Sequence, residues 1–426
     1  MARAAVLWVC LGFLAGLSVG AEDQELPVSY RGAQLLRLNL PSPSAHSLVE
    51  GLVDEGEVQL WRDREVNGTE LDILVKPDAL PVVQERLKNE SIEYDVVIAD
   101  LQEAIEQENS LVSESDLDVL MGRNGHRMEW QSYHRLQDIH HYLDFLAQTY
   151  PNLCSVQTIG SSLGGRPLKV LRIASDKPNS PAIWLDGGIH AREWISPASV
   201  TYIINQLTEY REQHGDAVQS VEWYILPVVN PDGYEHSHTG DRLWRKNRRS
   251  NGQGCLGVDL NRNFGYKWGG AGSSRRPCDE IYAGAHAFSE PETSAIQGFV
   301  KSHQAIKAYV SYHSYGQYIL YPWGYASYVP PDHTDLSKVG NKMAQAMASA
   351  GGGSYRVGSS AITLYPASGG SDDWAKGSAG VKYAYTVELR DRGRYGFVLP
   401  AQYIVPTAKE AFAAARTVAE AVLALK

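Results

Sequence analysis

The sequence lacks several features that would place it in a well-marked class of protein. It has no excess of basic residues, because 39 Lys and Arg stand against 49 Asp and Glu and the formal net charge is −10. This balance disfavours a nucleic-acid binder, which needs a basic surface. There is no internal repeat, and after residue 20 no apolar run is long enough to cross a membrane. What is present is an ordinary globular composition, with 43% hydrophobic residues and a length of 426 that suits two or three folded units.

The first 20 residues have the pattern of a secretory signal peptide. Arg3 supplies the basic start, residues 4–17 are apolar and almost uncharged, and Ser18 and Gly20 are small residues ahead of a cleavage point. An N-terminal membrane anchor is the alternative, but the stretch is short for a membrane span. We therefore predict a signal peptide at 1–20 and a secreted, extracellular protein.

Cysteine is scarce. The chain has four, and Cys10 leaves with the predicted signal peptide. In an oxidising compartment Cys255 and Cys278 can pair around a loop rich in Gly and Arg. Cys154 is then left over, and we interpret it as a buried thiol that packs as a small hydrophobic side chain.

Acidic residues are concentrated in the front quarter of the chain. Residues 21–127 carry 23 acidic and 9 basic side chains, a charge of −14, whereas residues 128–426 carry 26 acidic and 29 basic side chains, a charge of +3. The asymmetry indicates an acidic front segment and a mildly basic main body. The front segment follows a strand–helix–strand–strand–helix–strand order, which predicts a small α+β antiparallel sandwich. The expected strands lie within 30–40, 58–62, 71–75 and 94–98, and the expected helices at 44–55, 80–88 and 101–108.

Two kinds of modification site are suggested by pattern in the same segment. Asn67 and Asn89 stand in N-glycosylation patterns, which alone do not decide their use. The run Arg123–Arg127 follows an acidic helix and sets basic residues beside Gly and Asn. Such exposed segments are where proteases cut, although an ordinary linker has the same composition.

The main body has an α/β pattern. Its short β-rich runs are apolar on both sides, which predicts a mixed, mostly buried sheet flanked by helices. A body of this size can bury one large core. The expected strands are 168–173, 182–185, 222–229, 308–312 and 383–387, and the expected long helices are 136–150, 197–210 and 406–425.

Residue types suited to metal binding and proton transfer follow three of these strands. His190 and Glu193 stand three residues apart after one run, and His313 and Glu388 each follow the end of another. Two His and one Glu match the ligands of catalytic zinc, which keeps a fourth position open, and the remaining Glu is a candidate general base. Each residue alone has an ordinary interpretation, as an ion pair or a hydrogen-bonded core residue. Their shared position favours a site, because ligands of α/β sheets gather at the carboxyl ends of strands.

Two polar segments stand out besides these residues. Residues 242–249 and 259–263 are rich in Arg, Lys and Asn, which is usual for a solvated face but also suits a clamp on a carboxylate. Residues 364–374 form a Gly-rich segment with Tyr365 near one end and two carboxylates at the other, and a plain surface turn would have the same composition.

Six motifs occur in the same order as in the pancreatic-type zinc metallocarboxypeptidases, and the chain resembles a precursor of that family. Besides the signal peptide predicted at 1–20, the resemblance implies an activation propeptide with its connecting segment at 21–127 and a catalytic domain at 128–426. The motifs are His-Ala-Arg-Glu-Trp at 190–194, Asn-Pro-Asp-Gly-Tyr at 230–234, Arg-Leu-Trp-Arg-Lys at 242–246, Asn-Arg-Asn at 261–263, Tyr-His-Ser-Tyr at 312–315 and Glu-Leu-Arg-Asp at 388–391.

The resemblance implies a role for each matching residue. His190, Glu193 and His313 are the implied ligands of one Zn²⁺ ion. Glu388 is the implied base that takes a proton from the attacking water and gives it to the leaving amine, and Arg245 would stabilise the oxyanion. Cys255 and Cys278 match the disulfide of the family, in which Cys154 has no partner. The implied substrate-binding residues are Asn261 and Arg262 as a clamp on the terminal carboxylate, Tyr365 closing over it, and Arg192, Arg242, Ser314 and Tyr315 at subsites.

Asp372 stands where members of this family set their preference for the C-terminal side chain, in the S1′ pocket. An apolar residue there goes with apolar or aromatic C-termini, and Asp goes with Lys or Arg. The physical reason agrees, because a buried carboxylate is costly unless a cation pairs with it. The Gly-Gly-Ser before and the Trp after fix the register, so Asp373 is expected to have a structural role.

The leading interpretation is therefore a secreted, monomeric zymogen of a carboxypeptidase that removes C-terminal Lys or Arg from peptides and proteins. A trypsin-like protease would activate it by cutting after Arg123 or Arg127, and no nucleic-acid or membrane partner is expected. Two alternatives remain: an A-type enzyme for apolar C-termini, and a non-catalytic protein that binds peptide C-termini. The presence of all three ligands and the base disfavours the second.

Overall fold

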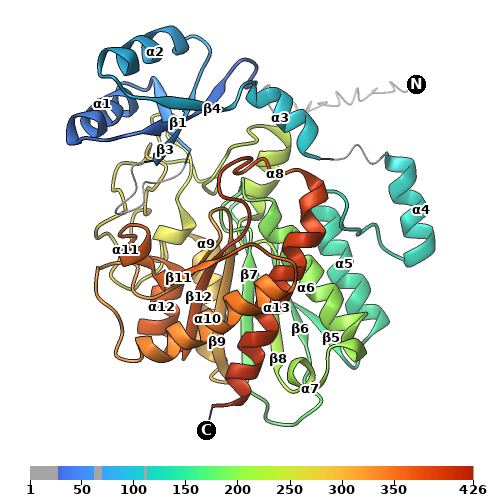
Figure 1. The fold of residues 1–426 in the computed structure, drawn as a ribbon. Coiled ribbons are helices and arrows are strands. Elements are labelled where there is room, and N and C mark those ends of the chain that lie inside the picture. Colours follow the sequence, from blue (N-terminus) through green and yellow to red (C-terminus); the bar gives the residue numbers. More distant parts are fainter. Residues whose placement is uncertain (1–26, 62–69, 110–112, 426) are drawn as a thin grey trace, which may run out of the picture.

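The computed structural model describes residues 27–61, 70–109 and 113–425 (Figure 1). The predicted signal peptide and Asn67 lie outside these residues, while Asn89 is exposed at the end of a helix. The described residues fold into a small unit, a larger unit and a helix that connects them.

The small unit is the predicted α+β antiparallel sandwich. Its described strands form one antiparallel sheet in the order β2-β3-β1-β4, with helices α1 and α2 on one face. Its elements are β1 (Gln34–Asn39), α1 (Pro43–Asp54), β2 (Val58–Leu60), β3 (Glu70–Val75), α2 (Leu80–Asn89), β4 (Tyr94–Ile98) and α3 (Leu101–Glu108).

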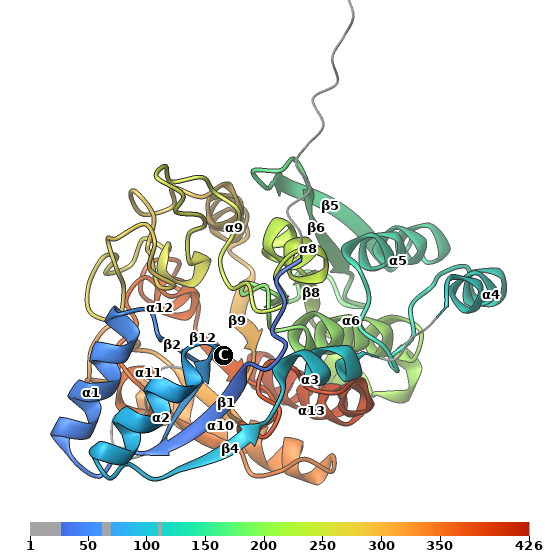
Figure 2. The ribbon, with the colours of Figure 1, turned by 90° about the horizontal axis from the view of Figure 1, so that it is seen from above.

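The two central strands of the small sheet, β1 and β3, are buried on both faces. Successive side chains of a strand point to opposite faces, so Leu36 and Leu38 of β1 pack beneath α1 and α2. Leu35 and Trp61 belong instead to a cluster that includes Phe397 of the larger unit. The small unit lies against the larger one (Figures 1 and 2), and the cluster that joins them is apolar.

The larger unit has the predicted mixed sheet. Its described strands run in the order β11-β10-β12-β9-β7-β8-β6-β5, and the central four, β12, β9, β7 and β8, are mutually parallel. The strands are β5 (Cys154–Ser161), β6 (Pro167–Ile173), β7 (Ala182–Gly187), β8 (Glu222–Leu226), β9 (Ile306–His313), β10 (Tyr318–Tyr321), β11 (Arg356–Ser359) and β12 (Tyr383–Glu388).

Helices cover both faces of this sheet, so its central strands are buried (Figure 1). Ile183 and Leu185 of β7 face the side covered by α5, α6, α10 and α13, and Trp184 faces the side of α9 and α12. The helices are α5 (Leu136–Thr149), α6 (Ile195–Thr208), α7 (Asp216–Gln219), α8 (Pro231–Thr239), α9 (Pro291–Ser302), α10 (His333–Ser349), α11 (Ser360–Thr363), α12 (Ser371–Gly377) and α13 (Ile404–Leu423), with short 3-10 turns at Arg211–Gln213, Leu260–Arg262 and Ala401–Tyr403. Within the described ranges, no helix combines the length and apolar character needed to cross a membrane.

The cysteines behave as predicted. Cys255 and Cys278 form a disulfide, and Cys154 is a buried free thiol at the start of β5. Burial raises the pKa of the Cys154 thiol to about 12, so the thiol stays protonated and packs as an apolar group.

Helix α4 (Glu114–Asn124) connects the two units and stands out from the side of the molecule (Figures 1 and 2). Ser113 and Asp116 form a capping box at its start, and Gly125 ends it in the left-handed conformation with φ of +77°. Arg123 lies in its last turn, and Arg127 follows two residues after the cap.

The core of the larger sheet leads to a stability prediction. Leu185→Ala, at a fully buried position of β7, should lower the free energy of unfolding by about 2–5 kcal/mol through lost burial and a cavity. Leu163→Ala is the control, because Leu163 is 43% exposed, and it should change stability by less than about 0.5 kcal/mol. Urea titration followed by tryptophan fluorescence measures both, and equal effects would contradict a core centred on β7.

Candidate active site

Three neighbouring parallel strands bring the candidate residues together. Glu388 at the end of β12 is paired in register with His313 at the end of β9, and β7 ends on the other side of β9. The chain turns after β7, and His190 and Glu193 lie in this turn before α6 begins. The predicted position of these residues at the carboxyl ends of strands is confirmed.

Two glycines let the turn after β7 pack against the start of α6. Gly188 has φ of +63°, and a Cβ atom on Gly187 would lie 2.7 Å from Ser196 Oγ. The Ser196 hydroxyl accepts from the Gly188 amide at 3.0 Å and donates to the Tyr312 carbonyl at 2.6 Å. This hydroxyl therefore ties the ends of β7 and β9 to each other.

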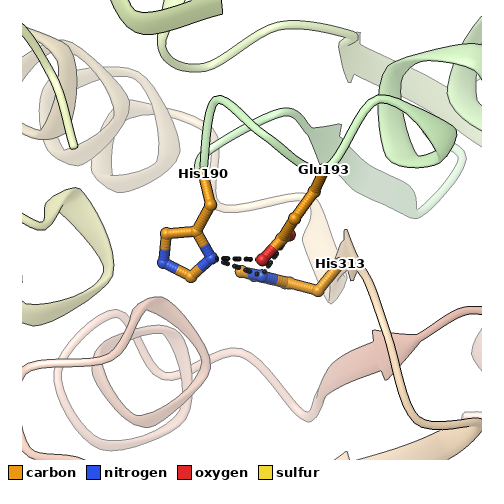
Figure 3. Close-up of side chains that lie close together, drawn as sticks. All are labelled: His190, Glu193 and His313. Atoms are coloured by element: carbon orange, nitrogen blue, oxygen red, sulfur yellow. Dashed lines mark hydrogen bonds and ion pairs between the residues drawn. The ribbon is translucent and has the colours of Figure 1, made fainter. Parts of the chain in front are cut away.

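His190, Glu193 and His313 converge on one point (Figure 3). The Nδ1 atoms of His190 and His313 lie 2.7 and 3.1 Å from the two carboxylate oxygens of Glu193 and 3.2 Å from each other. The side chains are 5%, 3% and 1% exposed in the order His190, Glu193, His313. Two nitrogen donors and one carboxylate at this spacing fit a zinc ion that keeps a fourth position open.

Other side chains orient both histidine rings. His190 Nε2 lies 3.2 Å from the Asp259 carboxylate, and His313 Nε2 lies 3.2 Å from the Ser311 hydroxyl, which in turn donates to Asp186 at 2.5 Å. When each ring is neutral, as a metal ligand must be, these contacts favour the proton on Nε2 and leave the lone pair of Nδ1 pointing to the shared centre. Such outer contacts are typical of histidines that bind a metal.

The site attracts positive charge. Burial alone would raise the pKa of Glu193, but the two histidines outweigh burial and hold it well below its usual range. Burial would lower the pKa of His313, but the Glu193 carboxylate outweighs it and raises this pKa to about 9. A cation at the centre would take over this stabilisation of the buried carboxylate.

Glu388 and Arg245 line the same cavity as the three converging residues. The Arg245 guanidinium is largely buried and makes two hydrogen bonds to Asp259 Oδ2, from Nε at 3.1 Å and from Nη2 at 2.9 Å. Burial favours the neutral acid, yet Arg245 and Arg262 hold the pKa of Asp259 well below its usual range. Asp259 thus holds two side chains in place: its Oδ2 atom accepts hydrogen bonds from Arg245, and its Oδ1 atom lies next to Nε2 of His190.

The predicted carboxylate clamp also lies in the cavity. Asn261 and Arg262 form the turn Leu260–Arg262, and Tyr365 faces the same space. Arg262 is fixed by hydrogen bonds from Nε to the Gly272 carbonyl at 2.7 Å and from Nη1 to the Asn261 carbonyl at 3.1 Å. Its guanidinium is thus held in place before any substrate binds.

The two neighbouring aspartates at the start of α12 differ in their surroundings. Asp373 accepts from the amides of Gly324 and Tyr325 at 2.8 and 2.9 Å, which fits the expected structural role. Asp372 lines the cavity, is 6% exposed and accepts from the Asp373 amide at 2.9 Å. Burial raises its pKa and outweighs the nearby His313 and the hydrogen bonds that Asp372 accepts, so the charged form is incompletely compensated.

The cavity encloses about 900 Å³ and lies between the two units. Arg192, Ser314 and Tyr315 line it as predicted, and Val58 and Leu60 of β2 contribute to its wall from the small unit. The Ser314 hydroxyl and Arg192 Nε are among the buried side-chain atoms for which the described residues offer no hydrogen-bond partner.

Arg242 is the exception among the predicted substrate-binding residues, because it does not line the cavity. Its guanidinium stacks over the Trp194 ring at 3.7 Å and makes two hydrogen bonds to the carboxylate of Glu108, the last residue of α3. It also donates to the carbonyls of Arg192 and Phe397 at 2.9 and 2.7 Å. In this form of the protein the small unit therefore occupies Arg242 through Glu108, and the expected contact of Arg242 with substrate in the activated enzyme stays a prediction.

The structure adds residues that the sequence had not singled out. Asp259 holds His190 and Arg245, Ser311 and Asp186 hold His313, and Glu108 holds Arg242. Asp259 lies in the polar segment 259–263. Its position two residues before the candidate clamp residue Asn261 was the only feature of the sequence that pointed to a role for it. For Glu108 the contact joins residues 134 positions apart and left no local signal.

Comparisons with known proteins agree with this geometry. The zinc carboxypeptidase family matches residues 139–414, and the carboxypeptidase activation peptide family matches residues 36–108. Carboxypeptidase B of Astacus astacus is 46% identical over 68% of this chain and 97% of its own length. Carboxypeptidase A1 of Bos taurus is 39% identical over 96% of this chain and 97% of its own. Among solved structures, thrombin activatable fibrinolysis inhibitor gives a TM-score of 0.84 at 33% identity, over 93% of this chain and 100% of that chain.

The matches cover both units, and the converging His, Glu and His residues fit the metal that gives the family its name. The chain is therefore a member of the zinc carboxypeptidase family, in the form of a zymogen that still carries its activation peptide.

Proposed function

We propose that this zymogen yields a secreted carboxypeptidase that removes C-terminal Lys or Arg from peptides and proteins. The proposed preference for Lys or Arg is based on one observation, the buried carboxylate of Asp372 in the cavity. The relatives include both A and B types, so the preference for basic residues rests on this residue. The disulfide Cys255–Cys278 supports secretion, because disulfides persist in oxidising compartments.

The binding step uses fixed positive and negative charges. Arg262 and Asn261 bind the terminal carboxylate of the substrate, and Tyr365 closes over it. The basic side chain enters beside Asp372, whose neighbours include the Thr386 hydroxyl and the Asp373 amide. A Lys or Arg side chain supplies the missing cation, whereas an apolar side chain leaves a buried carboxylate unpaired.

The hydrolytic step depends on groups at the strand ends. His190, Glu193 and His313 would hold the zinc ion, which would supply Lewis acidity and lower the pKa of water at this site. Glu388 accepts the proton of the attacking water and delivers it to the nitrogen of the leaving amino acid. Arg245, held by Asp259, donates hydrogen bonds to the oxygen on which negative charge develops.

The small unit keeps the precursor inactive by covering this cavity. It contributes part of the wall, and it holds Tyr315 and Arg242 through Asp72 and Glu108. The excess acidic charge of the small unit complements the mildly basic larger unit, which assists docking. Proteolysis of the connecting segment by a trypsin-like protease then allows this cover to leave.

The proposed base gives the first prediction for activity. Glu388→Gln removes the proton acceptor and should lower the kcat of the activated enzyme by roughly 10²–10⁴-fold, with one zinc per chain retained. Steady-state kinetics and metal analysis measure the two quantities. Glu420→Gln, at an exposed position of α13, is the matched control and should keep full activity. Near-normal turnover of the Glu388 variant would remove this residue as the base.

The proposed specificity pocket gives a second prediction, which concerns the choice of substrate. Asp372→Ala removes the partner of the basic side chain, which costs about 2–5 kcal/mol of transition-state stabilisation for substrates ending in Arg. The kcat/KM for such peptides should fall roughly 30-fold or more, while that for peptides ending in Phe should not fall. The measurement is a matched pair of peptides that differ in the last residue. A wild-type preference for Phe, or an unchanged ratio in the variant, would contradict the assignment.

The contact between Glu108 and Arg242 gives a third prediction, which concerns the release of the activation peptide. Glu108→Gln leaves a buried arginine without its carboxylate, so the activation peptide should dissociate roughly tenfold faster or more after the connecting segment is cut. Gel filtration and the time course of activity after limited proteolysis report this rate. Glu106→Gln, exposed on the same helix, should behave as the wild type. Equal dissociation rates for all three proteins would exclude a holding role for Glu108.

A further inference from the structure

Arg123 and Arg127 are both candidate activation sites, and their surroundings differ sharply. Arg123, Asn124 and Gly125 are all exposed at the end of α4. Arg127 is only partly exposed, and its guanidinium donates to the Asp118 carboxylate at 2.6 Å. The two residues on either side of Arg127 are buried, at 5% exposure for His126 and 3% for Met128.

His126 is fixed in a pocket of the larger unit. Its ring meets the edges of Tyr142 and Phe145 of α5, with centroids 4.8 and 5.0 Å apart. Its Nδ1 accepts from the Met128 amide at 3.1 Å, and its Nε2 lies 4.0 Å from a carboxylate oxygen of Glu209 beyond α6. The backbone that follows α4 is thus attached to the body of the enzyme at His126.

Gly125 brings the chain into this pocket. Its φ is +77°, and a Cβ atom there would lie 2.5 Å from Cε2 of Phe145. Only glycine tolerates both the left-handed backbone and this close approach. The position of His126 is therefore specified by its neighbour in the sequence as well as by its own contacts.

A protease must draw several residues on both sides of the bond into an extended conformation. At Arg127 this would pull His126 and Met128 out of their buried positions and break the contact with Asp118. At Arg123 it requires that the last turn of α4 opens, and the first buried residue after the bond is His126, three positions from Arg123. None of the described side chains of α4 is buried, and a single exposed helix of 11 residues is marginal by itself.

We propose that activation hydrolyses the Arg123–Asn124 bond and that the His126 anchor protects the bond after Arg127. Water adds hydroxyl to the Arg123 carbonyl carbon and a proton to the Asn124 nitrogen as the C–N bond breaks. The activated enzyme then begins at Asn124 and keeps His126 in its pocket. This inference rests on the proposed activation by an arginine-specific protease.

The test is limited digestion of the full-length precursor with trypsin, followed by N-terminal sequencing and intact mass of the large fragment at early times. The expected fragment begins at Asn124 and exceeds the fragment that begins at Met128 by at least tenfold. A fragment that begins mainly at Met128 overturns the site but leaves the proposed activation intact. A cut elsewhere, with no activity gained from a cut in the connecting segment, overturns both.

Two variants separate exposure from anchoring. Arg123→Gln lies at an exposed position and should fold normally, and its activation should slow at least tenfold. His126→Ala should release the following segment, so the share of fragments beginning at Met128 should rise at least fivefold, whereas His141→Ala, exposed on α5, should leave it unchanged. If Arg123→Gln is activated at the wild-type rate by a cut after Arg127, the proposed protection is wrong.

Discussion

The structure depends on one buried carboxylate that needs a cation. Glu193 is 3% exposed, lies between two imidazoles and stands at the ends of the most deeply buried strands of the sheet. A charge in such surroundings is costly unless it is paired and hydrogen-bonded. The parallel order of β12, β9 and β7 supplies the pairing, because it places residues that are 123 positions apart in sequence around one metal-sized point. The contacts of Asp259 and Ser311 then fix which ring nitrogen faces that point.

The same principle extends to the regulation of the enzyme. Arg242 is buried by the activation peptide and would be costly without Glu108, so each of these residues makes the other tolerable in the precursor. Asp372 has no such partner in the contacts described, and a basic substrate side chain is the group that would supply it. Charge pairing thus accounts for both the closed precursor and the proposed preference of the open enzyme.

The sequence predicted most of what periodicity and local chemistry can report. Tyr94–Ile98 and Leu101–Glu108 form as expected, and the residues after the apolar runs meet at one edge of the sheet. Strands β5, β10 and β11 were not among the expected strands. Edge strand β5 is only partly buried and has no continuous apolar run, which is the pattern that indicates a buried strand. The pairing of Glu108 with Arg242 could not be predicted, because it depends on how two folded units dock.

Gly125 and His126, which lie between the two candidate cleavage sites, also show that contacts made by tertiary packing could not be predicted from the sequence. The sequence placed basic residues in a linker and left Arg123 and Arg127 equivalent. The difference arises from Tyr142 and Phe145, which lie on a helix of the larger unit and bury His126. Composition predicts a segment in which the chain is cut, and the tertiary packing around His126 distinguishes the two candidate bonds.

The most direct test of the account is the zinc content of the full-length chain after equilibrium dialysis against zinc. We expect one zinc per chain for the wild type and almost none for His190→Ala, Glu193→Ala or His313→Ala. One tightly bound zinc in any of these three variants would contradict the assignment of this site as the metal centre.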